Sequence, residues 1–186
     1  MDINVQIKFL EQMLKKEENR ECSDCSSKTP RWASITYGTF VCLRCSGMHR
    51  QLQMKIKSVN LDKWKPEFFE LYKHINNKIA NAYWEANLPP NYQKPGQNSS
   101  SKEVESFIAD KYLNKRWAKE HMKHDPAYLF YHHKRKYEKF VKKVMAVKEE
   151  SESEESDEDS GKKKKHHHHH HKKDKKQHQQ PAPIVK

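Results

Sequence analysis

The hydrophobic positions of the chain recur mainly at helical spacing, with one short segment that alternates instead. Apolar residues three or four positions apart predict a helix over residues 3–18, with a core face of Ile3, Ile7, Leu10 and Leu14. The polar face of this helix mixes both charges, which favours packing against a core over insertion into a membrane. Residues 31–41 alternate in the manner of a β-hairpin, with strands at 32–36 and 39–41 and a turn near Gly38.

Helical spacing returns after the hairpin. It predicts helices over residues 42–52 and 62–85, the second with Pro66 in its first turn. The core positions of this second helix are Phe69, Ile75, Ile79 and Tyr83. A proline pair at 89–90 ends it.

Two more helices follow in the second half of the chain. The first is marked by the apolar positions Val104, Phe107, Ile108 and Tyr112. The second is basic and covers residues 126–147, because Asp125 and Pro126 form a typical N-cap and first-turn pair. The pattern as a whole predicts an α+β domain that is mostly helical, with one clear hairpin.

Composition separates a folded part from a tail. The 186 residues are 33% charged with a mean hydropathy of −1.21, which is polar for a chain that folds throughout. Residues 148–186 hold an acidic, serine-rich block and then a lysine- and histidine-rich block, so we expect this tail to be disordered. The histidine run at 166–171 fits a natural low-complexity tract or a purification tag, so we assign it no function.

The net charge of +12 lies in the folded part. Residues 1–148 hold 28 basic and 16 acidic residues, whereas the tail from 149 holds nine of each. Such a basic surface favours an anionic partner, which could be nucleic acid, anionic lipid or an acidic protein. We expect neither a membrane span nor a secretory signal, because no long apolar run and no basic-then-apolar leader is visible.

The four cysteines form two close pairs, Cys22 with Cys25 and Cys42 with Cys45, on either side of the predicted hairpin. Two residues between paired cysteines let both thiolates reach one metal ion, and the hairpin brings the pairs together. Four thiolates close a tetrahedral zinc site with Zn–S distances near ~2.3 Å and leave no position for a catalytic water. The spacing predicts one structural zinc ion, which occurs in DNA-binding, ubiquitin-transfer and protein-binding domains alike.

Arg50 follows the second cysteine pair on the predicted helix. An isolated arginine is usually a surface charge, but a planar guanidinium on a metal-anchored helix also suits phosphate oxygens in another protein's active site. In GTP hydrolysis such an arginine stabilises charge on the transferred phosphoryl group. With 4 glycines and no glycine-rich phosphate loop, we expect the chain to hydrolyse no nucleotide by itself.

Around these residues the sequence resembles the Arf GTPase-activating protein (Arf GAP) family, over about residues 8–120. Five separated motifs occur in the family's order: Cys22-x2-Cys25, Pro30-Arg31-Trp32-Ala33-Ser34, Gly38-Thr39-Phe40-Val41-Cys42, Cys45-Ser46-Gly47-Met48-His49-Arg50 and Leu61-Asp62-Lys63-Trp64. Three more stretches resemble the stromal-membrane-associated branch of that family: Lys57-Ser58-Val59-Asn60-Leu61-Asp62, Glu85-Ala86-Asn87-Leu88-Pro89 and Phe107-Ile108-x-Asp110-Lys111-Tyr112.

The resemblance implies a domain over residues 1–125 that folds as a four-cysteine zinc finger, with a small three-stranded antiparallel sheet surrounded by helices. It implies a protein that stimulates GTP hydrolysis by a membrane-bound Arf GTPase in its GTP form. Such a protein regulates vesicle traffic from the cytoplasm, at the periphery of Golgi or endosomal membranes. Residue by residue, it assigns catalysis to Arg50 and Trp32, zinc to Cys22, Cys25, Cys42 and Cys45, and partner contact to Ile35, Gly38 and His49.

The same resemblance gives the basic residues a natural partner. Arf acts on anionic membrane, so the last helix is a candidate for peripheral membrane contact through Lys134, Arg135, Lys136, Lys139, Lys142 and Lys143. A solvated helix is the alternative interpretation. We further expect a monomer that binds no nucleic acid.

One segment departs from the family pattern. After the arginine the family usually continues Leu-Gly-Val-His-Ile-Ser, whereas here residues 51–55 lead almost directly into Ile56, and Gln53 stands where glycine is usual. The segment leaves the catalytic helix, so its length bears on how Arg50 is aimed. A misplacement of about 1 Å can cost ~100-fold in rate.

Two other interpretations stay open at this point. A scaffold that binds Arf without activating it would keep the fold and lose turnover. A GATA-type DNA-binding finger has cysteine pairs at nearly this spacing, but it carries basic residues after its tryptophan, where this chain has Ala33 and Ser34.

Overall fold

The computed structural model describes residues 2–156, with side-chain environments for residues 2–146. Helix α1 (Ile3–Lys15) starts at Asp2, whose side chain accepts a hydrogen bond from the Asn4 backbone. A single 3-10 turn, η1 (Glu17–Asn19), replaces the last residues of the helix predicted over 3–18. Within α1, Leu10 is fully buried, whereas Ile3 is exposed at the free end.

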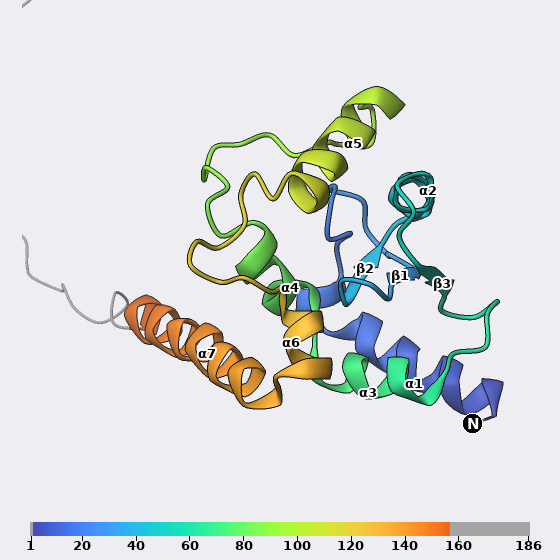
Figure 1. The fold of residues 1–186 in the computed structure, drawn as a ribbon, viewed down its shortest axis with the longest axis horizontal. Coiled ribbons are helices and arrows are strands. Elements are labelled where there is room, and N and C mark those ends of the chain that lie inside the picture. The colour runs from blue at the N-terminus through green and yellow to red at the C-terminus, as the bar shows by residue number, and fades with distance from the viewer. Residues whose placement is uncertain (1, 157–186) are drawn as a thin grey trace, which may run out of the picture.

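Three short strands form an antiparallel sheet at the centre of the molecule (Figure 1). They are β1 (Trp32–Ser34), β2 (Thr39–Val41) and β3 (Ile56–Ser58), and β1 lies between the other two. Trp32 pairs with Val41 on one side and with Ser58 on the other. The three-stranded sheet predicted by resemblance is therefore confirmed, although β1 ends at residue 34 rather than 36 because residues 35–38 form the turn.

The turn requires its glycine. Gly38 has a φ of +70°, a left-handed conformation that favours glycine, and a Cβ built there would lie 2.7 Å from Cδ1 of Ile75. The hairpin thus packs directly onto Ile75, in the short segment between the helices Pro66–His74 and Asn77–Trp84.

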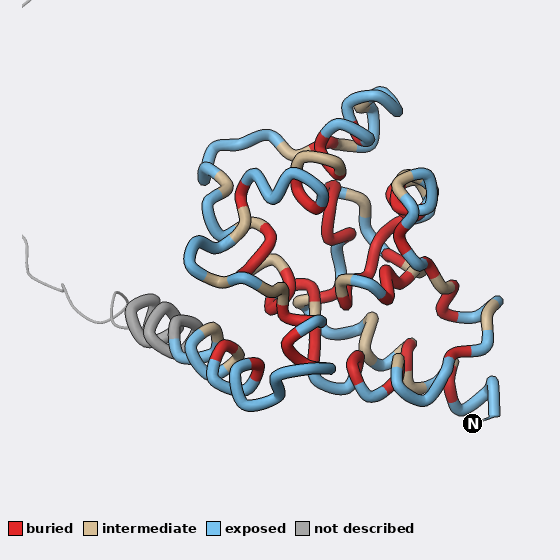
Figure 2. The backbone as a smooth tube through the Cα atoms, viewed as in Figure 1, coloured by how far each residue is buried: buried red, intermediate tan, exposed pale blue. Residues whose placement is uncertain are grey.

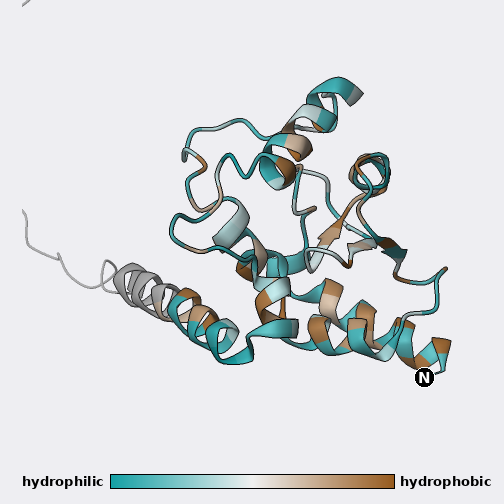
Figure 3. Ribbon diagram, in the orientation of Figure 1, coloured by the Kyte–Doolittle hydropathy of each residue, from teal (hydrophilic) through white to brown (hydrophobic). Residues whose placement is uncertain are grey.

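Helices surround the sheet and bury its apolar faces (Figures 2 and 3). The helix α2 (Leu43–Gln51) connects β2 to β3. It is followed by α3 (Pro66–His74), α4 (Asn77–Trp84) and α5 (Ser101–Ile108), and α5 continues into a π-helical segment, η2 (Ala109–Leu113). The last two helices are α6 (Pro126–His132) and α7 (Lys134–Ser156). No helix within residues 2–156 is both long and apolar enough to cross a bilayer.

The prediction of one helix over residues 62–85 is wrong. The chain breaks at residues 75–76, where the Asn76 side chain accepts a hydrogen bond from the Ile79 backbone and so starts α4 as a separate helix. The apolar spacing gave no sign of this break, because all four predicted core positions on both sides of it are buried.

The prediction of one basic helix over 126–147 is wrong in the same way. The cap itself is confirmed, since Asp125 accepts hydrogen bonds from the backbone of Ala127 and Tyr128. The helix breaks at His133, and α7 then continues to residue 156, through residues predicted to belong to a disordered tail. The rest of that tail, including the histidine run, lies outside the described residues.

The last two helices pack on the same core as the rest. The ring of Phe130 lies 5.6 Å from that of His74, and the hydroxyl groups of Tyr131 and Tyr137 donate to the carbonyls of Glu67 and His74. These contacts join α6 and the first turns of α7 to α3. The remainder of α7 projects away from the sheet, on the side of the molecule opposite α2 (Figure 1).

Candidate functional site

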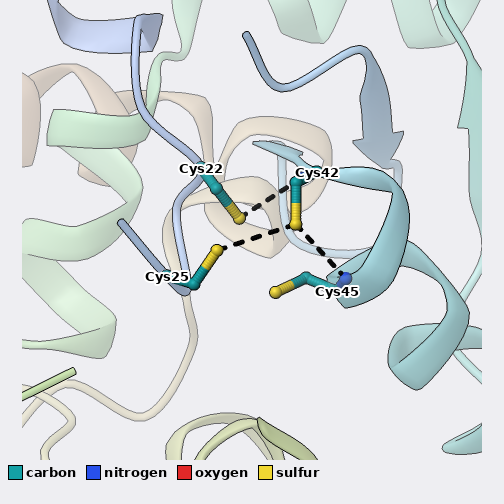
Figure 4. A group of neighbouring side chains, drawn as sticks. All are labelled: Cys22, Cys25, Cys42 and Cys45. Carbon is teal, nitrogen blue, oxygen red and sulfur yellow. Dashed lines mark hydrogen bonds between the residues drawn. The ribbon is translucent and has the colours of Figure 1, made fainter. Parts of the chain in front are cut away.

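The four cysteines converge on one point (Figure 4). Their sulfur atoms all lie within 4.8 Å of one another, and Sγ of Cys25 is 3.6 Å from Sγ of Cys42. The first pair lies in the loop before β1, and the second pair lies where β2 passes into α2. These separations fit a tetrahedron of thiolates around a single metal ion.

The pKa values of the four thiols also indicate that a cation binds between them. Burial raises the pKa of Cys22, and contact with the sulfur of Cys22 raises the pKa of Cys45, whereas hydrogen bonds with the other sulfurs lower the pKa of Cys25. Neighbouring thiolates therefore repel one another, and without a cation the four thiols do not all ionise. A divalent cation removes this conflict, because a coordinated thiol is deprotonated.

The metal site fixes the start of α2. Cys42 is the N-cap of that helix, and its sulfur accepts a hydrogen bond from the backbone N–H of Cys45 at 3.4 Å. The backbone N–H of Cys42 in turn donates to Sγ of Cys22 at 3.2 Å. The N-terminal end of the helix is consequently held by the metal ligands themselves, while Arg50 lies in its last turn.

Arg50 and Trp32 lie together at the surface. The guanidinium carbon of Arg50 is 5.2 Å from the centre of the Trp32 ring, which is a cation–π distance. Arg50 is exposed and Trp32 is half-buried. The tryptophan thus forms a support beneath an arginine whose donors face solvent.

The structure places the three predicted partner-contact residues inside the protein. Ile35 is 4% exposed, Gly38 is buried under Ile75, and His49 has no exposed area. Each residue is enclosed by the protein's own fold, and contact of these three positions with a partner stays a prediction.

The face of α2 that does reach solvent is different. Leu43, Gly47 and Arg50 are spaced by one turn each and are all exposed, and Leu43 is 69% exposed. A Cβ added at Gly47 would meet no atom within 4 Å, so nothing in the fold itself requires glycine there. This stripe of three residues, which we call the α2 face, is the surface that a partner of Arg50 would meet.

The shortened segment after Arg50 ends α2 with backbone hydrogen bonds to the last carbonyls of the helix. Gln53 has a φ of +66°, the left-handed conformation that favours glycine, and its backbone N–H donates to the Arg50 carbonyl at 3.0 Å. The backbone N–H of Met54 donates to the His49 carbonyl at 2.9 Å. Residues 52–55 are then sufficient to bring β3 alongside β1.

Sequence reasoning missed a buried ionic cluster behind the metal loop. Asp24, between the first two cysteines, accepts hydrogen bonds from Lys111 at 2.9 Å and from Tyr112 at 2.6 Å, and its other oxygen lies 2.6 Å from Nε2 of His49. Lys111 also pairs with Glu85 at 2.8 Å. A signal was present, because a lysine on the apolar face of a predicted helix needs a buried anion as its partner.

Comparisons with known proteins agree with this geometry. A family model described as "Putative GTPase activating protein for Arf" matches residues 7–121. The chain is 44% identical over 113 residues to "Probable ADP-ribosylation factor GTPase-activating protein AGD15" of Arabidopsis thaliana, covering 59% of this chain and 46% of that protein. It is 43% identical over 112 residues to stromal membrane-associated protein 1 of Mus musculus, covering 59% of this chain and 25% of that protein.

A solved structure, the ArfGap domain of HIV-1 Rev binding protein, is similar with a TM-score of 0.57 at 26% identity. The similarity covers 62% of this chain and 89% of that domain. The chain thus spans less than half the length of either curated relative, and the matched region ends before α6.

Proposed function

The chain belongs to the Arf GTPase-activating protein family, and from this premise we propose that it stimulates GTP hydrolysis by an Arf-type GTPase. In this proposal Arg50 enters the active site of the GTPase and stabilises the charge that develops on the transferred phosphoryl group. In this proposal GTP, Mg²⁺ and the attacking water belong to the GTPase.

One observation carries the proposal. The guanidinium of Arg50 is exposed, rests on the Trp32 ring, and belongs to a helix whose other end is fixed by the metal ligands. A side chain held on a rigid element reaches its target without the entropic cost of ordering a loop. Trp32 supports catalysis by holding the arginine in an extended position over its ring.

We assign zinc to the four-cysteine site. Four thiolates in tetrahedral arrangement are the usual ligands of structural zinc, and the closed ligand set leaves no position at which the ion could activate water. Zinc therefore stabilises the loop and the start of α2 and takes no direct part in hydrolysis. We expect one zinc ion per chain by elemental analysis.

The α2 face is the proposed contact surface for the GTPase. Its most exposed apolar residue, Leu43, lies two turns before Arg50, so a partner that receives the arginine also covers the leucine. Leu43→Ser should raise the KM for the GTPase and leave kcat nearly unchanged, because the leucine contributes binding and touches no reacting atom.

The basic helix α7 is the proposed membrane contact. Six cationic side chains on its described part are exposed: Lys134, Arg135, Lys136, Lys139, Lys142 and Lys143. Since α7 lies on the opposite side from α2, contact with anionic lipid would leave the α2 face free (Figure 1). This arrangement suits a regulator of vesicle traffic at Golgi or endosomal membranes. Equal flotation with neutral and anionic vesicles would remove this part of the proposal.

Single-turnover hydrolysis of GTP on a purified Arf, with anionic vesicles, tests the catalytic proposal. We expect Arg50→Lys to lower the stimulated rate by about 10³-fold, because lysine keeps the charge and loses the planar fork of donors. Arg20→Lys, a change at another exposed arginine, is the matched control and should have no effect. Zinc content is measured for each variant.

Two results would change the conclusion. If the wild-type chain holds zinc and binds Arf without accelerating hydrolysis, the protein is a scaffold. If Arg50→Lys is as active as the wild type, the arginine has another role and the mechanism is wrong.

A further inference from the structure

The buried imidazole of His49 connects the element that carries Arg50, α2, with the element that carries Trp32, β1. His49 immediately precedes Arg50 on α2, and its Nδ1 lies 3.2 Å from the hydroxyl of Ser34. Ser34 is on β1, two residues after Trp32, so both side chains point to the same side of the strand. One hydrogen bond therefore joins His49, the residue before Arg50, to Ser34, the next residue on the Trp32 side of β1.

The other side of the imidazole is held by Asp24. Nε2 of His49 lies 2.6 Å from Oδ2 of Asp24, and a carboxylate oxygen only accepts, so Nε2 donates. In the neutral ring Nδ1 then accepts from the Ser34 hydroxyl. The carboxylate thus sets the tautomer and the rotation of the ring, as it does for a histidine held by an acid in other sites.

Asp24 is itself fixed by η2, the segment that continues α5. Its Oδ1 accepts from Lys111 and Tyr112, two consecutive residues of the π-helical segment η2, and Lys111 has no exposed area. With two donors on Oδ1, the carboxylate is held in place and its Oδ2 is left to accept from His49.

We propose, on the basis of the function proposed above, that His49 is a positioning residue that sets Arg50 over Trp32, with Asp24 and Ser34 orienting its ring. Packing alone would not need this arrangement. Well-packed apolar residues hold two elements together at least as firmly as a buried ionic cluster, whereas directional hydrogen bonds select one relative orientation. The hydrogen-bonded series Lys111–Asp24–His49–Ser34 runs from η2 to β1; it passes through the residue before Arg50 and ends two residues after Trp32.

The first experiment measures GTP hydrolysis with variants that each remove a single hydrogen bond or ring from this hydrogen-bonded series. Ser34→Ala removes the link to β1, and His49→Gln keeps an amide donor for Asp24 and loses the ring. We expect each to lower kcat by about 10- to 100-fold with little change in KM, because a displaced arginine still binds and no longer stabilises the transition state. Ser46→Ala removes a buried hydroxyl from α2 that bonds only its own helix at the Leu43 carbonyl, and it should match the wild type.

A double-mutant cycle separates positioning from general stability. If His49 acts through Arg50, His49→Gln should change nothing further in a chain that already carries Arg50→Ala. Independent losses from the two substitutions would overturn the proposal. Zinc content and the midpoint of urea unfolding show whether each variant is folded under assay conditions.

The second experiment needs no activity, so it separates this inference from the proposed function. Stacking on an indole shifts the side-chain protons of Arg50 upfield in the NMR spectrum. We expect this shift to be present in the wild type and in Ser46→Ala, and to be lost in Ser34→Ala and His49→Gln. An unchanged shift in the last two variants would show that Arg50 holds its place without His49, even if the wild-type chain activates no GTPase.

Discussion

The buried ammonium group of Lys111 gives a stability prediction that can be worked from its contacts. Lys111→Met should lower the free energy of unfolding by about 3 kcal/mol. The Nζ atom donates to the Ser23 carbonyl at 2.8 Å, to Asp24 at 2.9 Å and to Glu85 at 2.8 Å. Methionine fills a similar volume and donates nothing, so the Asp24 carboxylate stays buried without its cation.

The contacts that survive set the magnitude. Breaking a buried ion pair by removing one partner costs about 3–5 kcal/mol. Here each acceptor keeps another donor, since Asp24 keeps Tyr112, while Lys94 still donates to Glu85 and to the Ser23 carbonyl. The loss therefore falls near the lower limit. For a chain of this size, about 3 kcal/mol corresponds to a Tm decrease of roughly 6–12 °C.

Urea unfolding followed by circular dichroism, with zinc present throughout, measures this change. Lys102→Met on the exposed side of α5 is the matched control and should stay within about 0.5 kcal/mol of the wild type. Adding Asp24→Asn to Lys111→Met should cost less than the sum of the single losses, by about 0.5–3 kcal/mol. If Lys111→Met behaves like the control, the pair contributes no net stability and the reasoning fails.

Four shorter predictions follow from other features. Removing zinc with a chelator should abolish cooperative unfolding, because structural zinc contributes about 10–16 kcal/mol in small domains; cooperative unfolding of the metal-free chain would contradict this. Gln53→Gly should raise the free energy of unfolding by about 1 kcal/mol, because the left-handed φ of Gln53 is unfavourable for any residue except glycine. Gln51→Gly, at the last residue of α2, should lower the free energy of unfolding by about as much. Gly47→Ala should raise it by about 0.5–1 kcal/mol in the same urea assay, because the position is helical and open. Burial raises the pKa of Asp125, so the ionised side chain is less stable in the folded chain than in the unfolded chain. Asp125→Asn keeps the cap, and its stability advantage over the wild type should be absent below about pH 4 and grow as the pH rises from there through the raised pKa of Asp125. An advantage that shrinks with rising pH would refute the assignment.

The metal site and the β1–β2 hairpin could be predicted because their determinants are local or fixed by motif spacing, whereas the third strand was expected only from the family resemblance. Two residues between paired cysteines and a hairpin between the pairs leave little freedom in how four sulfurs meet, and the observed cluster agrees. The helix breaks could not be predicted from apolar spacing. Asn76 caps a new helix at a point where the core pattern continues without change. The apolar spacing likewise gives no sign that α6 ends at His133, where the backbone leaves the helical conformation.

The polar interior was missed for a different reason. Gln6 in α1 is 1% exposed and bonds the carbonyls of Val59 and Asp62, and Lys111 bonds Asp24 across 87 positions. Such partners have no fixed offset along the chain, so no periodicity reveals them. Only the mismatch of a polar residue on an apolar face points to them, and it identifies one partner without the other.

Asp24 and Lys111 are far apart in the sequence, so during synthesis the metal ligands are available before the lysine that pairs with Asp24. A protein emerges from the ribosome N-terminus first, so all four metal ligands are available once residue 45 is out, long before the lysine. The nascent finger can take up its ion and form α2 while the carboxylate in its loop still lacks two of its donors. Metal binding can therefore precede the hydrogen bonds that hold Asp24, because those need Lys111 and Tyr112 of η2 to be synthesised and folded against the metal-binding loop.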